Sequence, residues 1–178
     1  APGYEHKVVD EDGNEVAPGV VGEICVRGHA LMRGMVGRTR DEVFDRDGWY
    51  HTGDSAHRDA DGHLYFAGRT DDMIKTSGAN VAPVEVEAVL SALPQVRIAY
   101  VVGVSDPTKG AVVAAAVVLN AGASATPEEL TAACRERLAA YKVPKRWEIL
   151  EDPSSLPYTS TNKIDKRALA TQLAEQAH

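Results

Sequence analysis

A carboxylate follows a glycine in the segment YHTGD at residues 50–54. Gly53 permits a tight turn, and Asp54 then projects its carboxylate just past that turn. A carboxylate in this position can accept two hydrogen bonds from a vicinal diol, such as that of a ribose. The same residues can also form an Asx-type turn, in which the side chain caps its own backbone. The spacing by itself is compatible with both interpretations.

A second charged segment spans residues 68–83 and has the sequence GRTDDMIKTSGANVAP. It begins with Arg69 and two aspartates, the first of which is Asp71. Lys75 and Gly78 follow, just before a predicted helix. Such a stretch can form a charged surface turn. It can also form a hinge, because hinges are a few residues at the ends of elements that absorb large changes in backbone dihedral angles.

A hydroxyl-rich loop leads to Lys163 within the segment LPYTSTNKIDKRAL at residues 156–169. Serine and threonine keep such a loop polar, and lysine supplies a compact positive charge that can contact phosphate and carboxylate oxygens together. A solvent-exposed lysine without a ligand is the alternative.

The elements that must position these residues differ between the two halves of the chain. Short strands separated by turns are expected over residues 5–70, and Asp61-Gly62 is typical of a hairpin turn. Thr39 and Glu42 have the spacing of a capping box, which predicts a short helical turn. The strands are expected at residues 6–10, 21–28, 55–58 and 64–67.

After Asp72, strands alternate with helices, which predicts an α/β or α+β layer. Apolar spacing predicts a helix over 83–93. The capping box of Thr126 and Glu129 predicts another over 127–140. Asp165 is expected to cap a closing helix. The strands are expected at residues 97–104, 111–119 and 146–150.

Bulk composition narrows the class of protein. The chain has 178 residues, of which 44% are apolar and 25% charged, as in ordinary globular proteins. No apolar run approaches about eighteen residues, so no membrane span is expected. The net charge of −7 argues against nucleic acid as the main partner, because phosphate neutralisation needs an excess of Lys and Arg.

Residue spacing gives no support to a metal site or a disulfide. Cys25 and Cys134 are far apart, and the six histidines show no metal-ligand spacing, so a reducing cytoplasm is expected. His51 is expected to have a positioning or solvent-facing role. The first residues lack signal-peptide features and an initiator Met, which is consistent with a chain that begins inside a longer protein.

Five motifs in order resemble the superfamily of acyl-CoA synthetases, firefly luciferase and peptide-synthetase adenylation domains. They cover nearly the whole chain and read VGEICVRG, DGWYHTGD, DGHLYFAGRTDDMIKTSGANVAPVEVEAVL, YKVPKRWEIL and LPYTSTNKIDKRAL. The resemblance implies a ligase that uses ATP, Mg²⁺ and CoA and activates a carboxylic acid as an acyl-adenylate. It also implies that residues 1–70 are the β-rich end of an incomplete AMP-binding body, and that 71–178 form a small α/β lid.

The resemblance also implies residue roles. Asp54 would bind the ribose hydroxyls, and Arg69 would lie beside ribose and phosphate. Asp71 would be the hinge of the lid, and Lys163 the adenylation lysine. Gly78 would let the CoA thiol pass close to the backbone.

Lys75 would face the adenylate in the second step. Asn162 stands where family members commonly have Gly before the lysine, and Asn tolerates positive φ. Ala79 is a further departure, in a position often taken by Gly or a polar residue.

Two alternatives stay open. NKIDKRAL echoes adenylation domains that load a carrier protein, whereas SGANVAPVEVEAVL favours CoA ligases. An isolated lid without activity of its own is the other alternative, because half of a nucleotide site offers few contacts. The acyl group is not predicted, because its pocket would belong to the missing body.

Overall fold

A computed structural model describes residues 3–175 of the chain. The chain divides into two compact units, residues 1–71 and 72–178. The first unit is mostly β and the second is α/β, so the predicted fold class is confirmed. Within residues 3–175, no helix has the length and apolar character needed to cross a membrane.

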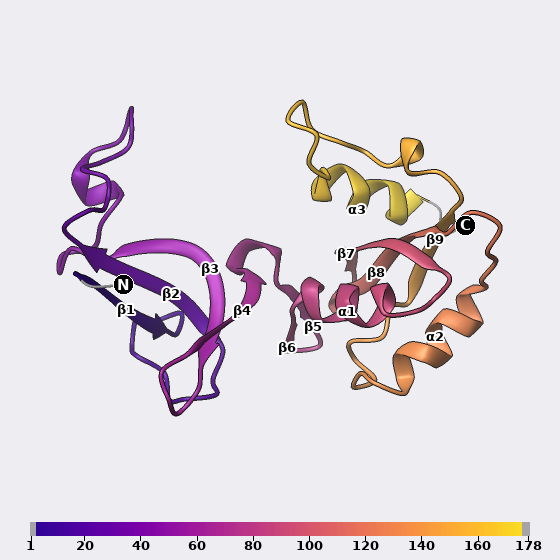
Figure 1. Cartoon of the computed structure of the whole chain (residues 1–178), viewed down its shortest axis with the longest axis horizontal. Helices are drawn as coiled ribbons and strands as arrows, with labels where there is room; N and C mark the ends of the chain where they lie inside the picture. Colours follow the sequence, from indigo (N-terminus) through magenta and orange to yellow (C-terminus); the bar gives the residue numbers. More distant parts are fainter. Residues whose placement is uncertain (1–2, 176–178) are drawn as a thin grey trace. The chain divides into compact units, whose positions relative to one another are not determined.

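The first unit is a four-stranded antiparallel sheet (Figure 1). Its order follows the chain, and its strands are β1 (Tyr4–Val9), β2 (Gly22–Gly28), β3 (Tyr50–Arg58) and β4 (Leu64–Arg69). The hairpin predicted at Asp61-Gly62 joins β3 to β4, and the Asp59 carboxylate accepts from the backbone N–H of Asp61 and His63 at 3.0 and 2.8 Å. The 3-10 turn Arg40–Glu42 begins where the capping box predicts it.

The structure corrects the prediction for YHTGD. β3 begins at Tyr50, so the segment is a bulged strand and not a tight turn. One residue lies between Glu23 and Cys25 on β2, but three lie between their partners Ser55 and His51 on β3. Gly53 has a φ of +71°, which lets the strand accommodate the extra residues.

In the second unit, the long strand β8 (Gly110–Leu119) is central. β7 (Val96–Asp106) pairs antiparallel with it, and β9 (Arg146–Leu150) pairs parallel along its other side. The near-continuous apolar character of β8 follows from burial on both faces. The helices that cover the faces of this sheet are α1 (Pro83–Ser91), α2 (Pro127–Arg135) and α3 (Lys166–Glu175).

Alternate residues of β8 belong to two different core clusters. Val113 and Val117 pack in the cluster that holds Leu90 of α1 and Leu130 of α2. Side chains at the intervening positions pack in the cluster that holds Leu169 of α3. Helices therefore cover both faces of the sheet.

Both predicted helix caps are confirmed. The Thr126 hydroxyl accepts from the Glu129 N–H at 3.2 Å, and the Asp165 carboxylate accepts from two N–H groups of the first turn of α3. α2 ends at Arg135, five residues before the predicted end. The short hairpin of β5 (Ile74–Thr76) and β6 (Ala79–Val81) was not predicted, because three-residue strands are too short to show alternation.

Candidate functional site

Asp54 and Arg69 face each other across β3 and β4 in the first unit. Arg69 Nη1 donates to Asp54 Oδ1 at 2.8 Å and to the Thr52 carbonyl at 3.3 Å. The Asp54 side chain is 37% exposed and the Arg69 side chain 50% exposed, so both can still reach a ligand. The pair thus presents a carboxylate, which accepts from hydroxyls, beside a guanidinium, which donates to phosphate oxygens.

The bulge that carries Asp54 is held by hydrogen bonds. Glu23 Oε1 accepts from the Gly53 N–H at 2.8 Å, and Thr52 Oγ1 accepts from the Asp54 N–H at 3.0 Å. A Cβ at Gly53 would lie 2.9 Å from Arg69 Nη2. Glycine is therefore needed here both for its positive φ and for the approach of the guanidinium. The carboxylate contacts a side chain of the neighbouring strand, which does not match the Asx-turn alternative.

Asp71 lies in the 3-10 turn Thr70–Asp72 and is exposed. It is the last residue of the first compact unit. The following residue, Asp72, accepts from Lys166 Nζ at 2.7 Å. No local sequence pattern indicates this ion pair, because its members are 94 positions apart in the chain.

Burial raises the pKa of Glu87, which lies near the same ion pair. Its Oε1 accepts from the Val101 N–H at 2.9 Å. That hydrogen bond and the positive charge of Lys166 lower the pKa, whereas the charge of Asp72 raises it. The positive charge of Lys166 therefore acts on two carboxylates, those of Asp72 and Glu87.

Lys163 lies in a tight loop closed by an isolated bridge between Tyr158 and Ile164. The Thr159 N–H donates to the Lys163 carbonyl at 2.8 Å, and the Lys163 N–H donates to the Thr159 hydroxyl at 3.2 Å. Asn162 has a φ of +59°, as its tolerance of that region predicts. Lys163 is exposed, and within residues 3–175 its ammonium forms no hydrogen bond or ion pair.

The β5–β6 turn carries the other predicted residues. Ser77 and Gly78 have φ values of +49° and +79°, which is typical of a type I′ turn. A Cβ at Gly78 would meet nothing within 4 Å, so the backbone conformation and not crowding within this chain requires glycine. Lys75 lies on β5 and is exposed.

A pocket of about 250 Å³ adjoins this turn within the second unit. Its lining includes Ser77, the lysines Lys109 and Lys145, and Tyr141, a residue that is 46% exposed. Two ammonium groups beside an aromatic ring suit an anionic ligand that carries phosphate. No sequence motif indicates this pocket, because its residues come from separate segments of the chain.

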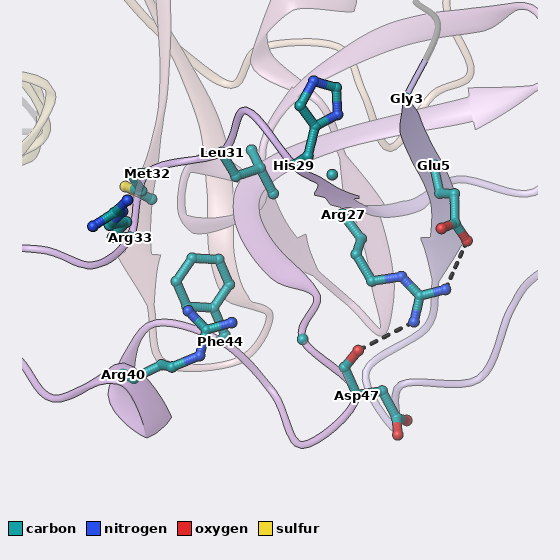
Figure 2. Close-up of a pocket in the computed structure, with 12 residues that line it drawn as sticks. Gly3, Glu5, Arg27, His29, Leu31, Met32, Arg33, Arg40, Phe44 and Asp47 are labelled. Carbon is teal, nitrogen blue, oxygen red and sulfur yellow. Dashed lines mark hydrogen bonds and ion pairs between the residues drawn. The ribbon is translucent and has the colours of Figure 1, made fainter.

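A larger pocket of about 590 Å³ lies in the first unit (Figure 2). Arg27, Arg33 and Arg40 contribute to its lining. Arg27 is tied to the Glu5 carboxylate at 2.6 Å and to the Asp47 carbonyl at 3.1 Å, as Figure 2 shows. Neither Asp54 nor Arg69 lines this pocket, so it is separate from the candidate ligand pair.

His51 pairs with Glu23 through Nδ1 and Oε2 at 2.8 Å. Cys25 lies opposite His51 and is buried. Burial, reinforced by the charge of Glu23, raises the pKa of the Cys25 thiol to about 11. No sequence motif indicates that Glu23, Cys25 and His51 lie together. Their proximity depends on the register between β2 and β3, which short motifs do not contain.

Two family models match the chain. One, for the AMP-binding enzyme, matches residues 1–36, and the other, for the AMP-binding enzyme C-terminal domain, matches residues 85–163. Together they lie on both compact units.

Curated relatives and solved structures agree with these matches. The chain is 42% identical to a long-chain-fatty-acid–CoA ligase of Escherichia coli O157:H7, over 94% of this chain and 29% of that protein. It is 36% identical to a crotonobetaine/carnitine–CoA ligase of Salmonella arizonae, over 93% of this chain and 32% of that protein. The ATP-bound structure of MatB from Rhodopseudomonas palustris superposes with a TM-score of 0.86 at 30% identity, over 99% of this chain and 35% of that one. The chain thus spans about a third of the length of these proteins.

Proposed function

This chain belongs to the AMP-binding, adenylate-forming enzyme family, and on that premise we propose that the whole protein is an ATP-dependent carboxylate–CoA ligase. In the first step a carboxylate oxygen attacks the α-phosphorus of ATP, and the bond to the β-phosphate oxygen breaks to release pyrophosphate. In the second step the sulfur of CoA attacks the acyl carbon, the bond to AMP breaks, and the thiol proton is lost.

One observation carries the proposal: a single small unit holds two turns with positive φ, each close in sequence to an exposed lysine. These are the Asn162-Lys163 loop and the Ser77-Gly78 turn beside Lys75. A lid that presents one turn in each step would explain why both are exposed, and rotation about Asp71 would exchange them. On this view, residues 1–70 are the end of the AMP-binding body and 71–178 are the lid.

Lys163 would act in the first step. Its ammonium lies on a short, hydrogen-bonded loop, which would fix its position once the loop enters the nucleotide site. A positive charge there would stabilise the charge that gathers when a carboxylate meets a triphosphate, and so would act mainly on the transition state.

Asp54 and Arg69 would bind the nucleotide. The carboxylate would accept from the ribose hydroxyls, and the guanidinium beside it would contact ribose and phosphate. Arg69 already holds the carboxylate at 2.8 Å, so little ordering remains when AMP binds.

ATP would enter as its magnesium complex. Asp165, the carboxylate that follows Lys163 in sequence, is engaged in capping α3, and the loop otherwise offers hydroxyls. We therefore assign no residue of this chain to magnesium, which the ATP phosphates would carry.

CoA would approach the Ser77-Gly78 turn. The pocket beside this turn, with Lys109, Lys145 and Tyr141, has the charge and the aromatic face that phosphate groups and an adenine ring require. Lys75 would face the adenylate in this step. A cytoplasmic location suits the two free cysteines and the supply of ATP and CoA.

AMP release by the whole protein tests this function. The protein is incubated with ATP, CoA and fatty or aryl acids, and AMP and the thioester are measured. Thioester formation that depends on CoA supports the proposal, whereas dependence on a carrier protein instead would show the alternative adenylation-domain function.

The chain described here is expected to be inactive alone. Calorimetry with AMP should show no binding in the micromolar range, because half of a nucleotide site cannot overcome the entropy of association. Micromolar binding would contradict this expectation.

A further inference from the structure

Three metal-ligating side chains meet on β2 and β3 of the first unit, outside the proposed nucleotide site. Glu23 and Cys25 are two residues apart on β2, so they share one face of the sheet. His51 is the direct partner of Cys25 on β3. One ligand atom from each of the three lies within 4.8 Å of the others.

The distances point to a shared centre. His51 Nδ1 lies 2.8 Å from Glu23 Oε2 and 3.4 Å from Cys25 Sγ. A ring nitrogen carries either one proton or one lone pair, so it cannot donate to the carboxylate and accept from the thiol at the same time. A cation between the three atoms would satisfy all of them.

The ligand types select the cation. A thiolate, an imidazole and a carboxylate are the ligands of Zn²⁺ and related transition ions, whereas Mg²⁺ and Ca²⁺ prefer oxygen alone. Bonds of roughly 2.0–2.3 Å in a tetrahedral site separate the ligand atoms by about 3.3–3.7 Å. The observed separations of 2.8 and 3.4 Å need only small side-chain shifts to reach that range.

The surroundings supply what such a site needs. The remaining ring nitrogen of His51, Nε2, faces Asp45 Oδ2 at 3.7 Å, and metal-bound histidines commonly direct this nitrogen to a carboxylate. Glu23 Oε1 is fixed by the Gly53 N–H, which leaves Oε2 for the metal. Cys25 is buried, but His51 and Glu23 are 41% and 23% exposed, so water can take the fourth position.

We propose that Glu23, Cys25 and His51 form a site for Zn²⁺ or a related divalent transition ion. Cys25 binds as the thiolate and releases its proton to solvent. Because Glu23 also holds the Gly53 N–H, the metal fixes the bulge that carries Asp54. We assign the metal no role in either chemical step.

Cobalt binding tests the site without reference to activity. Co²⁺ is titrated into the chain, and absorption is recorded for the sulfur-to-cobalt charge-transfer band and the tetrahedral ligand-field bands. We expect one equivalent to bind with both signatures, and Zn²⁺ to displace it. Absence of the charge-transfer band in the unmodified chain overturns the proposal.

Matched variants locate the signal. Cys25→Ser should abolish the charge-transfer band, whereas Cys134→Ser, at the other free buried cysteine, should keep it. His63→Ala should also keep it, although His63 belongs to a second cluster with Asp59 and Asp61. A band that survives Cys25→Ser, or that is lost in Cys134→Ser, contradicts the assignment.

Two further variants guard against misfolding. His51→Gln changes a partly exposed side chain and should remove tight binding with the circular dichroism spectrum unchanged. Asp45→Asn keeps an acceptor for the Asp47 and Trp49 N–H groups and should weaken binding by roughly tenfold. Unchanged affinity in His51→Gln would overturn the proposal.

Discussion

Lys166 donates to Asp72 at 2.7 Å and so joins the first turn of α3 to the residue that follows Asp71. Both side chains are 29% exposed. Lys163 lies three residues before this contact, and Asp71 lies one residue before its other end. The ion pair lies within the second unit and therefore ties the helix that follows the Lys163 loop to the residue next to the proposed hinge.

Loss of this ion pair should destabilise the second unit. Lys166→Met keeps the apolar stem but leaves Asp72 and Glu87 without their shared cation, so we expect a loss of about 1–3 kcal/mol in the free energy of unfolding. Urea denaturation measures it. Lys166→Met combined with Asp72→Asn should cost less than the sum of the single changes, and strict additivity would show that the two side chains do not interact.

Glu87 should give the stability of the chain a pH dependence. Burial raises its pKa above the usual 4.5, so between 4.5 and the raised value the folded state binds more protons than the unfolded state. Stability should therefore fall as the pH rises through this window. Thermal denaturation across pH measures the slope.

Glu87→Gln should remove the part of this pH dependence that comes from the Glu87 carboxyl group, and it should keep the hydrogen bond from the Val101 N–H. Glu128→Gln, at an exposed position of α2, should leave the slope as it is. Coincident profiles for Glu87→Gln and the unmodified chain would contradict the prediction.

Gly53→Ala should weaken nucleotide binding in the whole protein. The change strains a backbone with φ of +71° and pushes against the Arg69 guanidinium, so the Asp54–Arg69 pair must shift. We expect KM for ATP to rise by roughly tenfold, about 1.4 kcal/mol.

Gly62→Ala is the matched control for that variant. Gly62 has a φ of +88° but nothing within 4 Å of an added Cβ, so it carries similar strain without touching Arg69. Its KM for ATP should stay unchanged. An equal rise in both variants would mean that general destabilisation, and not the Asp54–Arg69 pair, sets KM.

Lys163→Ala should separate the two chemical steps. Removing an ammonium that acts on the first transition state is expected to slow adenylation by roughly 10²–10³-fold. Thioester formation from supplied acyl-adenylate should be spared, and Lys75→Ala should show the reverse preference. Pyrophosphate exchange and thioester assays measure the two steps, and equal loss of both in Lys163→Ala would refute its role.

Lys145→Ala should raise KM for CoA by about three- to tenfold, because an ammonium that lines the pocket beside Gly78 is lost. Pyrophosphate exchange should not change. Arg135→Ala serves as control, since Arg135 is an exposed cation of α2 that does not line the pocket. A change in exchange but not in KM for CoA would place Lys145 elsewhere in the mechanism.

The sequence alone determined the local structure of this protein. Capping boxes at Thr39 and Thr126, the Asp165 cap and the Asp61-Gly62 hairpin all lie where their residue types predict, because each depends on neighbours within about five residues. The motif order likewise indicated the family. YHTGD was assigned the wrong element, since a positive φ at Gly53 serves a bulge as well as a turn.

Tertiary structure decided which distant residues meet. The Lys166–Asp72 pair, the pocket at Lys145 and the cluster of Glu23, Cys25 and His51 all depend on strand register or on the docking of α3. Register is set by how whole faces of a sheet are buried, and no short motif contains that information. Residue types could therefore indicate the chemistry of single side chains, but only the packed sheets determined their partners.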